Sequence, residues 1–133
     1  MFGKKNNSNP QNSIDSLIGA GARIEGNMTF TGGLRVDGEI LGNICTEPGQ
    51  PGTLVISELA RVEGEISVGH VVINGTVVGP VFADESLELL PKARVTGDLE
   101  YRRIEMQQGA IVQGRLIHRK NAGAGEAKPI SSN

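Results

Sequence analysis

Apolar and polar positions alternate with a period of two through the central part of the chain. In one such stretch the first set of alternate positions is apolar or glycine: Leu34, Val36, Gly38, Ile40, Gly42 and Ile44. The set between them is mostly polar: Arg35, Asp37, Glu39, Leu41, Asn43 and Cys45. Alternation puts one set inside and the other outside a β-strand, and Val and Ile suit a pleated, half-buried surface. The pattern therefore predicts β-strands through the centre of the chain.

A five-residue unit recurs within this pattern: a branched apolar residue, any residue, glycine, any residue and an apolar residue. Its copies are Ile24–Met28, Val36–Ile40, Val62–Ile66, Ile73–Val77, Val95–Leu99 and Val112–Leu116. A series of short, nearly identical units is typical of a solenoid, in which each unit stacks on the next. The repeat therefore predicts an all-β solenoid.

One series of glycines sets the spacing of the predicted coils: Gly26, Gly42, Gly64, Gly79, Gly97 and Gly114. The successive gaps are 16, 22, 15, 18 and 17 residues. The longest gap contains Thr46–Thr53, whose two prolines and two glycines predict an inserted loop. Coils of this length suit a three-sided β-helix of about six coils between Ile18 and Ile117. Two reasons for the glycine stay open: a Cβ that would not fit between coils, or a positive φ at a bend.

The chain of 133 residues predicts one domain with a polar segment at each end. The first and last segments hold too few apolar residues to bury a core of their own. We therefore expect a disordered N-terminal tail over residues 1–16, a β-helix over 17–118 and a disordered C-terminal tail over 119–133.

The composition argues against several classes of function. A net charge of −2 and an aromatic content of 3% are unlike a nucleic-acid-binding surface. A single cysteine, Cys45, excludes an internal disulfide. There is no apolar run of 18 residues, no phosphate-binding loop and no Cys/His metal spacing. We therefore expect no membrane span, nucleotide, metal, cofactor or catalytic site.

The two ends of a solenoid expose unpaired backbone groups and apolar side chains unless they are capped. No amphipathic capping unit is visible at either end of the repeat. We therefore expect end-to-end self-assembly, with a filament as the product if the contacts do not close on themselves. The expected interface residues are Leu17, Ile18 and Ile24 at one end and Ala110, Val112 and Leu116 at the other. The alternative is that the tails fold back and cover the ends.

Five segments together carry a resemblance to a known family. They are "ARIEGNM" from Ala22, "LRVDGEILGNI" from Leu34, "ARVEGEI" from Ala60, "VVINGTVVGPV" from Val71 and "ARVTGDLEYRRIEMQQGAIVQGRL" from Ala93. In these segments the chain resembles the bactofilins, the bacterial polymer-forming cytoskeletal family. The resemblance implies a right-handed triangular β-helix and end-to-end filaments that form without nucleotide. The family's filaments are described as non-polar, although the residues themselves leave like-to-like and head-to-tail contacts open.

The N-terminus adds a second match, because bactofilins often begin with Met-Phe followed by lysines. Here the matching residues are Met1, Phe2, Lys4 and Lys5. Two apolar side chains can enter a membrane interface while two lysines meet anionic lipid. The resemblance implies a cytoplasmic location at the inner face of the cell membrane. It also implies cell-wall enzymes, or shape-determining and chromosome-positioning factors, as partners.

Two other readings remain. A solenoid that does not polymerise could be an adaptor that binds other proteins on its flat faces. A left-handed β-helix acyltransferase would need marker residues at multiples of six and a histidine general base. Four of the five glycine gaps, 16, 22, 15 and 17, do not fit that spacing, and His70 and His118 are the only histidines. We expect both histidines to be surface residues.

Overall fold

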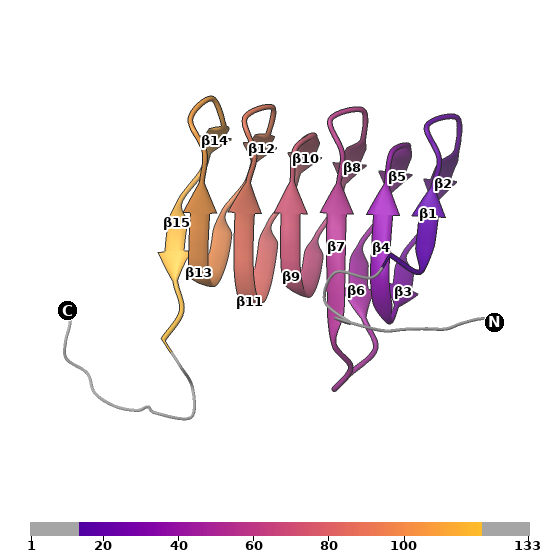
Figure 1. Cartoon of the computed structure of the whole chain (residues 1–133), viewed down its shortest axis with the longest axis horizontal. Helices are drawn as coiled ribbons and strands as arrows, with labels where there is room; N and C mark the ends of the chain where they lie inside the picture. Colours follow the sequence, from indigo (N-terminus) through magenta and orange to yellow (C-terminus); the bar gives the residue numbers. More distant parts are fainter. Residues whose placement is uncertain (1–13, 121–133) are drawn as a thin grey trace.

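The computed structural model describes residues 14–120, and β-strands are the only regular elements within that range. The first strands are β1 (Ser16–Ile18), β2 (Arg23–Glu25), β3 (Met28–Phe30), β4 (Gly32–Val36), β5 (Glu39–Leu41), β6 (Ile44–Thr46), β7 (Gly52–Ile56) and β8 (Arg61–Glu63). The later strands are β9 (Ile66–Ile73), β10 (Thr76–Val78), β11 (Val81–Leu89), β12 (Arg94–Thr96), β13 (Leu99–Met106), β14 (Ile111–Gln113) and β15 (Leu116–His118). Every strand pair is parallel, and the strands stack as the coils of a solenoid (Figure 1).

Each coil crosses three faces. Face A consists of β1, β4, β7 and the second halves of β9, β11 and β13. Face B consists of β2, β5, β8, β10, β12 and β14. Face C consists of β3, β6, the first halves of β9, β11 and β13, and β15. Six strands on face B define six coils, which we number 1 to 6 in chain order, and we name the corners AB, BC and CA after the faces they join.

The solenoid is right-handed. In Figure 1 the strands of face A point up at the front, the chain returns behind them, and successive coils advance from right to left. Nearly all parallel crossover connections take this hand, because a right-twisted strand packs back onto its sheet only in that way. The long strands β9, β11 and β13 pass around corner CA, where the register of β11 shifts between Ala83 and Ser86.

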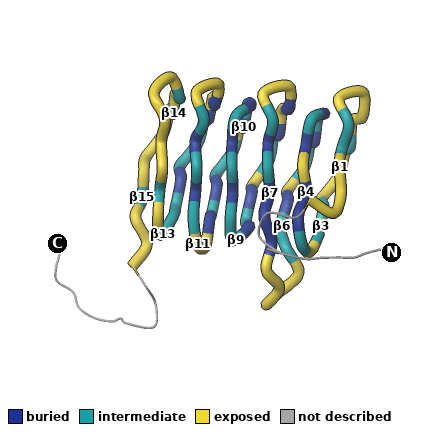
Figure 2. The backbone as a smooth tube through the Cα atoms, viewed as in Figure 1, coloured by how far each residue is buried: buried dark blue, intermediate teal, exposed yellow. Residues whose placement is uncertain are grey.

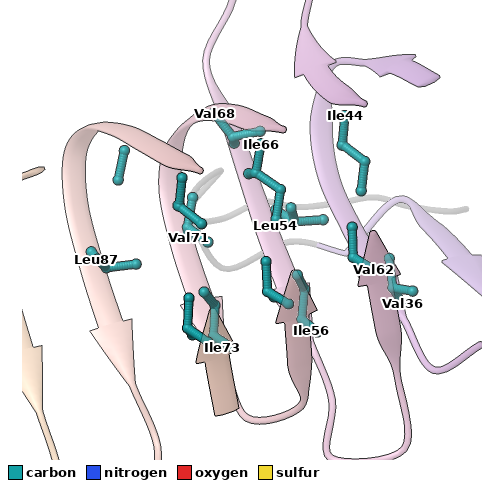
Figure 3. Packing of buried hydrophobic residues seen from close by; sticks show 14 of the residues in the cluster. Val36, Ile44, Leu54, Ile56, Val62, Ile66, Val68, Val71, Ile73 and Leu87 are labelled. Carbon is teal, nitrogen blue, oxygen red and sulfur yellow. The ribbon is translucent and has the colours of Figure 1, made fainter. Parts of the chain in front are cut away.

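Inward side chains form columns that continue from coil to coil. On face C the register aligns Ile44, Ile66, Val81 and Leu99, and all four are 0% exposed. Similar columns on the other faces complete a core of 20 buried apolar residues, part of which Figure 3 shows. Burial is highest in the middle coils and falls in the two end coils (Figure 2). The aliphatic repeat therefore supplies the hydrophobic stabilisation of the fold.

The recurring glycine stands at corner BC in every coil, where the coils approach most closely. A Cβ added to Gly97 would collide with the carbonyl oxygen of Gly79 in the preceding coil. Gly97 also has a φ of +146°, a conformation that favours glycine. Both explanations that the sequence leaves open therefore apply at Gly97: a Cβ does not fit between the coils, and the backbone has a positive φ. Gly26, in coil 1, has the same kind of φ but no atom within 4 Å of an added Cβ, because no coil precedes it.

The predicted insertion lies at corner CA between coils 2 and 3. It follows β6, and the backbone N–H of Gln50 donates to the carbonyl oxygen of Glu47 at 3.0 Å to close a turn. Gly52 and Thr53 fall in β7 rather than in the loop, because Gly52 pairs with Gly32 in the face A ladder. The insertion therefore lengthens one corner without disturbing the stack.

The expected all-β, three-sided, right-handed solenoid of about six coils is confirmed. Hydrogen bonding extends to residues just outside the strands at both ends. The Asp15 backbone N–H donates to the Gly33 carbonyl oxygen at 2.9 Å, and the Arg119 backbone N–H donates to the Tyr101 carbonyl oxygen at 2.7 Å. The rest of the two predicted tails lies outside the described residues.

Replacement of a corner glycine should destabilise the fold sharply. We expect Gly97→Ala to lower the free energy of unfolding by about 1–3 kcal/mol from backbone strain alone, with steric collision added. Gly69→Ala is the matched control, since an added Cβ there meets its nearest atom at 3.6 Å, an ordinary contact. Denaturant unfolding followed by circular dichroism measures both variants. Equal losses for the two would contradict the role of the glycine column.

Candidate assembly interface

Coil 1 leaves an apolar surface open at the N-terminal end of the solenoid. The inward side chains of this N-terminal end surface are Ile18, Ile24, Met28 and Phe30, and all four are only half-buried. Within the described residues, β1, β2 and β3 each pair with a single neighbour. The end of coil 1 therefore presents apolar side chains together with a row of unpaired backbone groups.

Coil 6 leaves a second apolar surface at the other end. The inward side chains of this C-terminal end surface are Ile104, Met106, Ala110, Val112 and Leu116. Met106 is 45% exposed and Leu116 is 46% exposed. Their counterparts one coil earlier, Leu89 and Leu99, are both 0% exposed. Within residues 14–120, the columns of the core therefore end at coil 6 with no polar capping unit beyond them.

Five of the six expected interface residues lie in these two end surfaces: Ile18, Ile24, Ala110, Val112 and Leu116. The structure places the sixth, Leu17, elsewhere on coil 1. Leu17 pairs with the outward Arg35 of face A and is 58% exposed. Since side chains alternate along a strand, the residue before the inward Ile18 must point outward.

Four other residues of the end surfaces are absent from the sequence-based set: Met28, Phe30, Ile104 and Met106. In the sequence, each of these residues is separated by the length of one coil from the residue with which it pairs in the neighbouring coil. Met28 pairs with Ile44, and Met106 pairs with Leu89. Applying the coil spacing to every inward position, not only to the glycine units, would have identified them.

Polar contacts hold coil 6 against the preceding coils. The Asp98 carboxylate accepts hydrogen bonds from the backbone N–H and the guanidinium of Arg115, both at 3.0 Å. Arg119 forms ion pairs with Asp84 at 3.0 Å and with Glu100 at 3.8 Å. These contacts fix the position of β15, whose backbone ladder to β13 is only three residue pairs long.

The contact between Asp98 and Arg115 shifts the pKa values of both groups. The backbone N–H of Arg115, and then its guanidinium, lower the pKa of Asp98 below its ordinary value. The Asp98 carboxylate in turn raises the pKa of Arg115, through the hydrogen bond first and the charge second. A carboxyl with a lowered pKa stabilises the fold above its ordinary pKa, and this contribution is lost as the pH falls through the lowered value.

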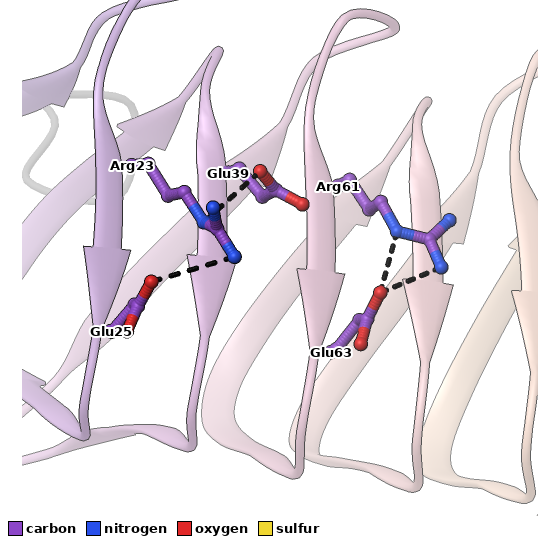
Figure 4. A network of polar contacts seen from close by, with 5 residues as sticks. All are labelled: Arg23, Glu25, Glu39, Arg61 and Glu63. Atoms are coloured by element: carbon purple, nitrogen blue, oxygen red, sulfur yellow. Dashed lines mark hydrogen bonds and ion pairs between the residues drawn. The ribbon is translucent and has the colours of Figure 1, made fainter.

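Face B carries ion pairs near the N-terminal end of the solenoid. Arg23 pairs with Glu25 at 3.4 Å and with Glu39 of the next coil at 3.6 Å, and Arg61 pairs with Glu63 at 2.7 Å (Figure 4). All of these side chains are substantially exposed, so each pair contributes at most about 1 kcal/mol. They place charged side chains on the part of face B that coils 1 to 3 contribute.

The two histidines lie on different coils. His70 lies at corner CA beside a hollow of about 750 Å³ that the insertion and Cys45 also line. Its Nδ1 is 2.8 Å from the hydroxyl oxygen of Ser86. His118 lies in β15, with its ring centroid 6.0 Å from that of Tyr101. Both positions are explained by contacts between successive coils.

Residues 14–120 contain no cluster of three or more His, Cys, Asp or Glu side chains suited to a metal ion. Over the same range there is no helix that could cross a membrane. The residues expected to bind the membrane, Met1, Phe2, Lys4 and Lys5, lie outside the described residues.

Comparison with known proteins identifies related chains. The family model described as "Bactofilin: Polymer-forming cytoskeletal" matches residues 16–117. Bactofilin BacP of Myxococcus xanthus (strain DK1622) is 29% identical over 116 residues, which cover 87% of this chain and 47% of BacP. Bactofilin BacO of the same organism is 28% identical over 102 residues, 77% of this chain and 78% of BacO. The chain thus spans about half the length of BacP. No solved structure matches the chain.

Loss of the Asp98 contact should loosen the last coil. We expect Asp98→Ala to increase deuterium uptake over residues 113–118 at neutral pH, because the Arg115 backbone N–H loses its acceptor. Asp98→Asn keeps an acceptor oxygen and should show a smaller increase. The difference between wild type and Asp98→Asn should shrink as the pH falls through the lowered pKa of Asp98. A difference that stayed constant between pH 7 and pH 2 would contradict a role for the charge.

Proposed function

The chain belongs to the bactofilin family of polymer-forming cytoskeletal proteins, and from this premise we propose that it is a non-enzymatic scaffold whose solenoids join end to end into filaments without nucleotide. The observation that carries the proposal is the pair of apolar end surfaces, against which no further strand packs within the described residues. Inward side chains that are 0% exposed in the middle coils become 45–46% exposed at Met106 and Leu116. Covering these side chains with a second copy would remove apolar surface from water.

The backbone supports the same assembly. Within the described residues, the strands of the end coils have a neighbour on one side only. A second solenoid could satisfy the free N–H and C=O groups by extending the sheets, as one coil does for the next. Each junction would then combine apolar contact with backbone hydrogen bonds, and a non-closing series of such junctions is a filament.

We further propose that the filament lies at the inner face of the cell membrane and is attached through Met1, Phe2, Lys4 and Lys5. The support is chemical: two apolar side chains next to two lysines suit an anionic bilayer surface. One such tail binds weakly, but a filament presents many copies, so attachment gains from multivalency. Scaffolding of cell-wall enzymes or of other cytoskeletal proteins at the membrane is the role that follows from this arrangement.

A charge in the C-terminal end surface should block assembly. Negative-stain electron microscopy of the purified chain, without added nucleotide or metal, should show extended thin filaments. Leu116→Arg should give single solenoids, because the junction would bury an unpaired guanidinium. Its circular dichroism spectrum should remain that of β-sheet, since Leu116 packs at the open end of the core.

Ile111→Arg is the matched control for this experiment. Ile111 belongs to the same coil and is 48% exposed, close to the 46% of Leu116. It lies in the outward set of face B, paired with Arg94. Filaments should persist in this variant. Filaments in Leu116→Arg would contradict the end-surface interface, and particles of one solenoid in wild type would favour the adaptor reading.

Deletion of Met1–Lys5 should separate attachment from assembly. We expect the shortened chain to form filaments that co-sediment much more weakly with anionic vesicles, because assembly uses the end coils and attachment uses the tail. The same sedimentation without vesicles corrects for pelleting of the filaments themselves. Undiminished co-sedimentation with vesicles would refute attachment through the tail.

A further inference from the structure

Corner CA brings both ends of the described chain to one edge of the solenoid. Ile14 leads into β1, where face A of coil 1 begins. Lys120 follows β15, where face C of coil 6 ends. Between these points the same corner carries the insertion and the bends of β9, β11 and β13 (Figure 1). The segment that holds Lys4 and Lys5 is therefore joined to the solenoid at this corner.

Charge is strongly segregated along the solenoid. Residues 101–120 contain five cationic side chains and one acidic side chain, a formal charge of +4. Residues 14–100 contain five cationic and 13 acidic side chains, a formal charge of −8. The small net charge of the whole chain conceals this division. The cationic end of the molecule is coil 6 together with the bend that leads into it.

Four of these cations lie at corner CA, and we name them the basic corner: Arg102, Arg103, Arg119 and Lys120. Arg102, Arg103 and Arg119 line a hollow of about 300 Å³ together with His118 and Glu85. Arg119 is engaged by Asp84 and Glu100. Among the described residues, Arg102, Arg103 and Lys120 have no acidic partner within the 4.0 Å that defines an ion pair.

We propose that the basic corner is a second membrane contact, which binds the anionic headgroups of phospholipids. The proposal rests on the proposed attachment of the N-terminal tail to the membrane and adds a site on the folded domain. Guanidinium groups match phosphate oxygens through paired hydrogen bonds, and Arg102 and Arg103 are the arginines of the corner without an acidic partner. The point where the N-terminal tail joins the solenoid and the basic corner lie on one edge but at opposite ends of the subunit. Contact at both points lays the filament axis parallel to the bilayer.

Acidic groups on the same edge oppose this contact only in part. Glu85 shares the hollow with Arg103, and Asp84 is engaged by Arg119. Glu47, in the insertion, lines a larger hollow together with Arg103, although their backbones lie about three coils apart, or roughly 14 Å at the usual spacing of strands. Glu88 and Glu105 line a further hollow with Arg103, but among the described residues none of these carboxylates forms an ion pair with it. The basic corner therefore acts as a local cationic site on a solenoid that is acidic elsewhere.

The test measures co-sedimentation of the full chain with vesicles of neutral phosphatidylcholine and with vesicles that also contain phosphatidylglycerol. We expect Arg102→Gln/Arg103→Gln to bind the anionic vesicles about 25-fold more weakly than wild type, since each cation near the surface strengthens binding about fivefold. Arg61→Gln/Lys92→Gln is the matched control. It removes the same charge from face B and corner AB, and its binding should stay within about twofold of wild type.

Each outcome has a distinct meaning. Equal binding of both double variants would overturn the basic corner while leaving the tail proposal intact. Equal binding of wild type to neutral and anionic vesicles would contradict both proposals, because the two lysines of the tail also require anionic lipid. Failure of wild type to bind any vesicle would refute membrane attachment itself. A DNA duplex that competed with anionic vesicles for the wild type at lower phosphate concentration would assign the corner to nucleic acid.

A second measurement covers the case in which Arg102→Gln/Arg103→Gln folds poorly. The measurement uses the chain that lacks Met1–Lys5, whose remaining vesicle binding depends on the basic corner. Raising NaCl from 0.1 to 0.5 M should weaken this binding, because salt screens the attraction between the arginines and the anionic headgroups. Vesicle binding of the tail-deleted chain that did not change with salt would also overturn the proposal.

Discussion

Hydrogen bonding between consecutive parallel coils is the constraint on which the rest of this structure depends. Each coil must stack closely enough on the last for its backbone groups to pair across all three faces. At corner BC this closeness leaves no space for a Cβ, and glycine returns there in every coil. Once the coils are held in register, inward aliphatic side chains fall above one another and form a continuous core. The sequence repeats because every coil makes the same contact with the coil before it and therefore needs the same residue types at the same positions.

The same contact makes the ends of the solenoid chemically unlike its middle. In coils 2 to 5 each strand has a neighbour on both sides, whereas coils 1 and 6 are bonded on one side within the described residues. Their inward side chains are of the same kind as those of the core but stand partly in water. Exposed apolar surface joined to unpaired backbone is a strong driving force for association with a like surface. No ligand or chemical step is needed to explain how such a chain would polymerise.

The proposed assembly and the proposed membrane contact use separate parts of the molecule. The end surfaces lie across the solenoid axis, and corner CA runs along it (Figure 1). A filament built through the ends keeps every corner CA available, so the number of membrane contacts grows with filament length. The polar contacts of Asp98 and Arg119 matter for both parts, because they hold β15 in position. This last strand contributes Leu116 to the C-terminal end surface and lies next to the basic corner.

Much of this protein could be predicted from its sequence, because a solenoid is built from local repeats. Alternation and the glycine spacing predicted the strands, the six coils and the insertion, and five of the six residues expected at the ends of the solenoid lie in the end surfaces. The direction of Leu17 and the part played by Ile104 and Met106 were missed, since both depend on the register of a whole strand. Only the tertiary structure brought Arg119 to Asp84, which lies 35 residues earlier in the chain, and gathered the basic corner on the edge where both ends of the described chain lie. The physical reason is that the same inward positions are buried in every coil, so each short unit of the sequence carries the apolar pattern. Charged residues on a corner come from different coils and become neighbours only after the coils have stacked.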